Sequence, residues 1–119
     1  MSSGQSLHEA LFQAMGEAQD ALCQMVPLGA ALAEAEREYR VQKRTRTLWE
    51  RSGGAPVTII GDLVCGCDDI AALRLRRDCA QAEYDANREA LMLAKKIIDT
   101  IREMIAREWS ANGNDQAWN

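Results

Sequence analysis

The sequence contains few aromatic residues and few prolines. Aromatic residues make up 5% of the 119 residues, and the only prolines are Pro27 and Pro56. The chain draws instead on alanine, leucine, methionine, glutamate and arginine, which are good helix formers. The length allows one domain with a modest core. We therefore predict a single all-α domain over residues 1–119.

Long apolar runs are also missing. None approaches the roughly 18–20 residues that a membrane-spanning helix requires. Residues 1–5 lack the basic and apolar regions of a signal peptide. We therefore expect a cytoplasmic protein with no membrane partner. In a reducing compartment, the cysteines should be free thiols; they are Cys23, Cys65, Cys67 and Cys79.

No catalytic or metal-binding constellation can be assembled from the sequence. It offers no nucleophile–base pair, no glycine-rich phosphate loop and no cluster of histidine with carboxylates. Cys65, Cys67 and Cys79 could offer thiolates to zinc, but paired Cys-x2-Cys knuckles are absent and Cys79 falls three turns into a predicted helix. His8 is expected to be a solvated first-turn residue. We predict a non-enzymatic protein with no cofactor and no metal.

The first half of the chain predicts two helices. Ser6 and Glu9 form a capping-box pattern, and apolar residues recur at helical spacing after it, which predicts a helix over 7–24. Pro27 predicts a break near Val26 and the start of a second helix, because proline suits the first turn of a helix but not its interior. This helix, over 27–52, should end where Gly53 and Gly54 supply a C-cap.

The second half predicts one long helix over 68–110, with a disordered tail over 111–119. A heptad seam runs along the helix: Ile70, Leu73, Arg77, Ala80, Tyr84, Asn87, Leu91, Ala94, Ile98, Ile101 and Ile105. Arg77 and Asn87 fit polar residues that set the register of a coiled coil. The prediction is a long antiparallel helical hairpin with an N-terminal helix and a short insert at the apex.

A second apolar stripe lies beside this seam, so the face is too wide for one partner helix. The part left exposed should form an interface between two copies, most simply in a homodimer. The predicted oligomer interface consists of Leu93, Ile97, Ile101, Met104 and Trp109.

The apex insert over 53–67 contains the run PVTIIGDLV, which can be read as a strand or as a short helix with Pro56 at its first position. The short helix is favoured because a lone strand would find no partner in this chain. In either case Ile59, Ile60, Leu63 and Val64 should fold back as an apolar plug. The plug is expected to meet Leu48, Trp49, Ile70 and Leu73.

Basic residues gather around this insert. Residues 37–77 carry nine basic and five acidic residues, a net charge of +4, whereas the rest of the chain carries −8. Arginine predominates, and its planar fork recognises phosphate or carboxylate bidentately. The candidate partner-binding residues are Arg40, Arg44, Arg46, Trp49, Arg51, Arg74 and Arg76.

Part of the chain resembles a family of small helical proteins of phages and prophages of Gram-positive bacteria, often encoded near phage recombination genes. The resemblance covers about 34–109 and rests on the stretches APVTIIGDLVCG, ALRLRRDCAQAEYDANREA and IREMIAREW. It implies a phage origin and a role in modulating host machinery or in phage DNA metabolism. The first 30 residues and the Cys65/Cys67 pair depart from the family pattern, so no role of theirs follows from it.

Two functions are compatible with these features. The favoured one is a phage protein that binds and modulates a host protein, such as an inhibitor of a host nuclease or defence system, by analogy with anti-CRISPR proteins. The alternative is a single-stranded nucleic-acid-binding accessory of phage recombination that uses the basic apex and Trp49.

Overall fold

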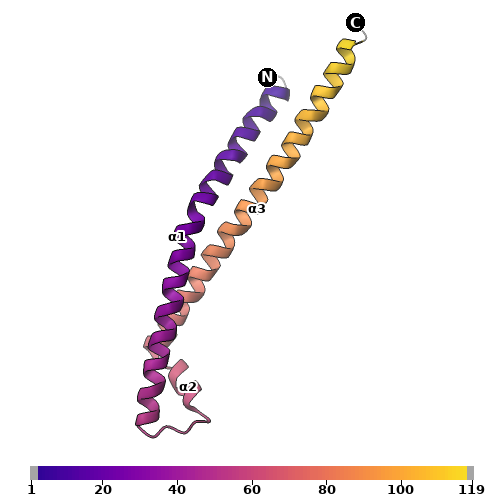
Figure 1. Ribbon diagram of the computed structural model, residues 1–119. Coiled ribbons are helices and arrows are strands. Elements are labelled where there is room, and N and C mark those ends of the chain that lie inside the picture. Colours follow the sequence, from indigo (N-terminus) through magenta and orange to yellow (C-terminus); the bar gives the residue numbers. More distant parts are fainter. Residues whose placement is uncertain (1–2, 118–119) are drawn as a thin grey trace. The chain divides into compact units, whose positions relative to one another are not determined.

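The computed structural model describes the backbone of residues 3–117 and the side chains of residues 4–112. It contains three helices: α1 (Ser3–Ser52), α2 (Ile60–Cys65) and α3 (Asp68–Ala117). No strand occurs within the described residues. The predicted all-α fold, in which two long antiparallel helices are joined through a short one, is confirmed (Figure 1).

The chain divides into two compact units. Unit 1 combines residues 1–25 with residues 87–119, and unit 2 comprises residues 26–86. In each unit a segment of α1 lies beside a segment of α3 that runs in the opposite direction (Figure 1). Unit 2 also contains α2 and the turns on either side of it.

The predicted break near Val26 is wrong, because α1 is one continuous helix with Pro27 in its interior. The two helices predicted over 7–24 and 27–52 are therefore one. Proline removes the hydrogen bond to the carbonyl four residues earlier, here that of Cys23. Both residues are exposed, so water can solvate this carbonyl.

The less exposed face of α1 passes Pro27 without a change of register. Its positions follow one another at intervals of four and three: Leu7, Leu11, Ala14, Ala18, Ala21, Met25, Leu28, Leu32, Ala35 and Tyr39. This is the spacing of a coiled-coil seam. The packing of this face stabilises the helix on both sides of the proline and offsets the lost hydrogen bond.

Helix α3 begins at Asp68, as predicted, but it continues beyond residue 110 to Ala117. The prediction of a disordered tail is therefore wrong for 111–117, and 118–119 lie outside the described residues. Glycine, asparagine and aspartate cost at most about 1 kcal/mol each in a helix, and proline, which costs about 3 kcal/mol, is absent from this segment.

The predicted seam of α3 is confirmed, since every one of its residues is buried or half-buried. In unit 1 its core residues are Leu91, Ala94 and Ile101, together with Ala14 and Ala21 of α1. Small alanines allow two helix backbones to approach closely.

Asn87 ties the two helices of unit 1 together. Its Nδ2 donates to the carbonyl oxygen of Ala21, 2.8 Å away, and lies 3.1 Å from the sulfur of Met25. A buried polar group needs its hydrogen-bond partners, so it favours the register between α1 and α3 that supplies them. This agrees with the role predicted for Asn87.

The apex insert forms a turn followed by α2. Gly54 has φ +92°, a left-handed conformation that favours glycine, and the N–H of Gly53 donates to the carbonyl of Trp49. The choice of helix over strand is confirmed. Helix α2 starts at Ile60 rather than at Pro56, whose carbonyl accepts the N–H of Ile60.

The plug is real but differs in composition from the prediction. Val64 is 0% exposed and packs with Ile70 (2%) and Tyr39 (6%), and the partly buried Ile60, Cys67 and Leu73 surround this cluster. Ile59 and Leu63 of the predicted plug are instead exposed, and so are Leu48 and Trp49, which the plug was expected to meet. The start of α2 explains the difference, since Ile60 and Val64 are four residues apart and share one helix face.

Val64 should be the most sensitive apolar position of the apex. Val64→Ala removes two buried methyl groups and leaves a cavity, so the free energy of unfolding should fall by about 2 kcal/mol. Val57→Ala is the matched control, since Val57 is exposed and should change the same quantity by less than about 0.5 kcal/mol. Urea unfolding followed by circular dichroism measures both. Equal losses would contradict the packing described for α2.

Candidate functional site

A groove of about 620 Å³ lies on the surface of unit 2, between α1, α3 and the end of α2. Five of its lining residues are basic and one is acidic. The lining consists of Glu36, Tyr39, Arg40, Lys43, Arg44, Thr47, Leu48, Cys65, Arg74 and Arg77. We call it the basic groove. Its lining also includes Leu48 and Tyr39, so it combines positive charge with apolar surface.

Tyr39 and Arg77 form the fixed part of the groove. The guanidinium carbon of Arg77 lies 4.6 Å from the centre of the Tyr39 ring, and the ammonium of Lys43 lies 5.6 Å from it. Nη2 of Arg77 donates to Oδ1 of Asp78 at 2.9 Å, and its Nε lies 3.6 Å from Oε2 of Glu36. The hydrogen bond to Asp78 is the main reason that the pKa of Arg77 is raised.

The remaining cations of the groove differ in how far they are neutralised. Arg40 pairs with Glu36 at 2.7 Å. Arg44 and Arg74 make neither an ion pair nor a side-chain hydrogen bond within the described part of the chain, and Lys43 contacts only the ring of Tyr39. The groove therefore presents three cations with which no carboxylate among the described residues pairs.

The seven predicted partner-binding residues do not form one surface. Arg40, Arg44 and Arg74 line the basic groove, whereas Arg46 and Trp49 line a separate groove of about 240 Å³. Arg46 lies 5.0 Å from the Trp49 ring and 3.6 Å from a carboxylate oxygen of Glu50. Nη1 of Arg46 also lies 3.9 Å from Oδ2 of Asp69 in α3, so its charge is already paired within the chain.

The other two predicted residues also have partners within the chain. Arg76 pairs with Glu38 across the helices, and Arg51 donates to the carbonyl of Ala55 in the turn. The prediction omitted Lys43 and Arg77, which line the groove. Their spacing was a usable signal, because Lys43 follows Arg40 by three residues and Arg77 follows Arg74 by three, which places each pair on one helix face.

The predicted oligomer interface is divided as well. Leu93, Ile97 and Met104 are exposed, but Ile101 is 8% exposed within the chain and cannot contact a partner. Ile101 occupies a seam position, which explains its burial. Trp109 is 79% exposed and lines a groove with His8 and Arg102.

The thiols and carboxylates do not gather into a metal site. All four cysteines are free, and Cys23 and Cys79 are exposed. Among the residues with described positions, no three histidine, cysteine or acidic side chains lie close enough together to hold a metal ion. The helices described here also contain no apolar stretch long enough to cross a bilayer.

Comparisons with protein families, with curated proteins and with solved structures gave no match. The resemblance to phage and prophage proteins stays a prediction.

One exposed ion pair near the basic groove predicts a measurable titration. The pKa of Glu34 is lowered, first by the hydrogen bond and then by the charge of Arg37, whose Nη2 lies 2.7 Å away. A carboxyl whose pKa is lowered by folding adds stability above its unfolded pKa, and this contribution is lost as the pH falls through the folded pKa. NMR titration of the Glu34 side chain should show a higher pKa in Arg37→Gln. Arg40→Gln is the control and should leave it unchanged; a Glu34 pKa that does not respond to Arg37→Gln would contradict the pairing.

Proposed function

We propose that this chain is a non-enzymatic binding protein whose basic groove takes an acidic segment of a partner protein. The observation that carries the proposal is the set of cations without an ion pair among the described residues, Lys43, Arg44 and Arg74, in one groove with the apolar side chain of Leu48. Carboxylates would pair with the guanidinium forks, and an apolar side chain next to them would contact Leu48 and Thr47.

The aromatic residues favour a protein ligand over a single-stranded nucleic acid. Binding of single strands normally combines phosphate contacts with bases stacked on free aromatic rings. Tyr39 in the basic groove is buried, and its ring is occupied by Arg77 and Lys43. The exposed Trp49 lies in the other groove, beside Asp69. Bases bound along the basic groove would thus find no free ring.

The net charge also bears on the choice. The whole chain carries −4, which opposes the approach of a long polyanion. A short acidic segment needs to meet only the local positive surface, which can steer and orient it. With the phage resemblance, the partner would be a host protein and the effect on it a modulation, such as inhibition of a nuclease or defence enzyme.

The proposal can be tested with two labelled probes of equal charge, a glutamate-rich peptide with a central leucine and a single-stranded thymine oligonucleotide. Fluorescence anisotropy should show tighter binding of the peptide. Arg44→Gln combined with Arg74→Gln should weaken peptide binding at least about 10-fold, because charge-assisted contacts contribute about 1.5–3 kcal/mol each.

The control is Arg37→Gln combined with Arg76→Gln, which removes the same charge from arginines already paired with Glu34 and Glu38. Binding by this variant should stay close to that of the wild type. Equal losses in both double variants, or no peptide binding at low salt, would refute the basic groove as the site. Tighter binding of the oligonucleotide would instead support the nucleic-acid accessory.

A further inference from the structure

Unit 1 exposes two apolar stripes, one on each long helix. The α1 stripe consists of Phe12, Met15 and Leu22, and the α3 stripe of Leu93, Ile97 and Met104. All six side chains are at least partly open to solvent although each adjoins a seam residue. Exposed apolar side chains that recur at helical spacing are typical of a surface that another helix covers.

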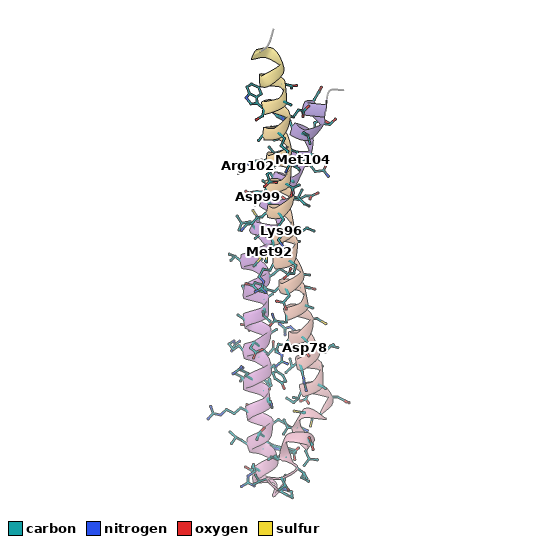
Figure 2. All side chains as sticks on the ribbon, turned by 90° about the vertical axis from the view of Figure 1, so that its right-hand side faces the viewer. Asp78, Met92, Lys96, Asp99, Arg102 and Met104 are labelled. Atoms are coloured by element: carbon teal, nitrogen blue, oxygen red, sulfur yellow. The ribbon has the colours of Figure 1, made fainter. Side chains whose placement is uncertain are left out.

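The two stripes lie on opposite sides of unit 1. The members of the α1 stripe directly follow seam residues, whereas those of the α3 stripe directly precede them. These positions lie on opposite flanks of a seam. His8, seven residues before Met15, shares a groove with Arg102 and Trp109, so the flank of α1 that carries the α1 stripe adjoins the flank of α3 that carries Arg102. Figure 2 shows Arg102 and Met104 on opposite flanks of α3.

Charges of opposite sign accompany the two stripes. Arg88, Lys95 and Arg102 directly follow seam residues of α3 and thus lie on the side of the α1 stripe, where Asp99 is the acidic residue. Glu17 and Asp20 directly precede seam residues of α1 and thus lie on the side of the α3 stripe. On that side Arg107 is the basic residue, and it already pairs with Glu103.

Apart from that of Arg107, none of these charges is paired with an opposite charge in the part of the chain that the structure describes. Arg88, Lys95, Arg102, Glu17 and Asp20 form no ion pair with any described residue. The spacing of the two stripes also matches. Met15 and Leu22 are seven residues apart, as are Ile97 and Met104, so their side chains can meet along two aligned helices.

We infer that unit 1 binds a second copy of this chain, with the α1 stripe of one copy packed on the α3 stripe of the next. The basic residues beside the first stripe then face the acidic residues beside the second. Since the two surfaces differ, the contact is heterologous. After two copies bind, one still has a free α3 stripe and the other a free α1 stripe. Association therefore proceeds beyond a dimer. The inference does not depend on the basic groove of unit 2.

Two single variants each remove one surface. Met15→Glu places a charge in the α1 stripe, and Ile97→Glu places one in the α3 stripe. In sedimentation velocity, the wild type should form concentration-dependent species larger than a dimer. Each variant alone should be mainly monomeric, with an apparent dissociation constant raised at least about 10-fold.

Mixing the two variants gives the decisive result. The Met15→Glu chain keeps an intact α3 stripe and the Ile97→Glu chain an intact α1 stripe, so the mixture should form a dimer and nothing larger. Ala82→Glu, at an exposed α3 position in unit 2, is the control and should associate like the wild type. Circular dichroism of every variant checks that the helices are retained.

A wild type that is monomeric at all concentrations would overturn the inference. So would an effect of Ile97→Glu alone, with no effect of Met15→Glu and no dimer in the mixture, because that pattern belongs to a two-fold contact of α3 with α3. If the stripes bound only another protein, the wild type and all variants would be monomeric, which is the first of these two contradicting results.

Discussion

The uninterrupted register of small and apolar residues along α1 is the constraint on which the rest of the structure depends. The seam contains alanines at 14, 18, 21 and 35 among larger apolar side chains, and the spacing of four and three continues across Pro27. In each unit this face packs on the matching seam of α3, and in unit 1 Asn87 of that seam hydrogen-bonds to Ala21 and Met25 of α1. Which side chains remain exposed follows from this pairing. The charged flanks are therefore a consequence of the seam.

The same constraint explains how the basic groove arises. Tyr39 occupies a seam position and is too large and polar to be buried by apolar contacts alone, so the arginine and lysine beside it lie over its ring. Arg77, itself a seam residue, is fixed by Asp78 and Glu36. Arg44 and Arg74 line the same groove and have no ion pair among the described residues. A ligand would bring the carboxylates that the groove lacks.

Much of the fold could be predicted from the sequence, because heptad spacing reports burial directly. The seam of α3 from Ile70 to Ile105 is an example, as is the start of α3 at Asp68. The break predicted at Pro27 is wrong because it was based on the preference of proline for the first turn of a helix. The spacing of apolar residues, which continues on both sides of Pro27, was the better guide. The start of α2 was misplaced because Pro56 is an equally good first residue of a turn.

The site was harder to predict than the fold. A cluster of arginines in the sequence does not reveal which of them pair within the chain, and Arg46, Arg51 and Arg76 are held by Glu50, the carbonyl of Ala55 and Glu38. Helical spacing could have separated Arg40, Lys43 and Arg44 from Arg46. It could not have placed them opposite Arg74 and Arg77, because that pairing depends on the length of the apex insert and on the register between α1 and α3.

Amide hydrogen exchange around Pro27 tests the central claim most directly. In a continuous α1, the N–H groups of residues 28–31 donate to the carbonyls of residues 24–27. They should exchange at least about 100-fold more slowly than in an unstructured peptide, as should amides two turns away on either side. A helix that began afresh at Pro27 would leave its first N–H groups without acceptors. Rapid exchange confined to residues 28 and 29, whose acceptors at 24 and 25 such a helix would lack, would contradict the continuous helix.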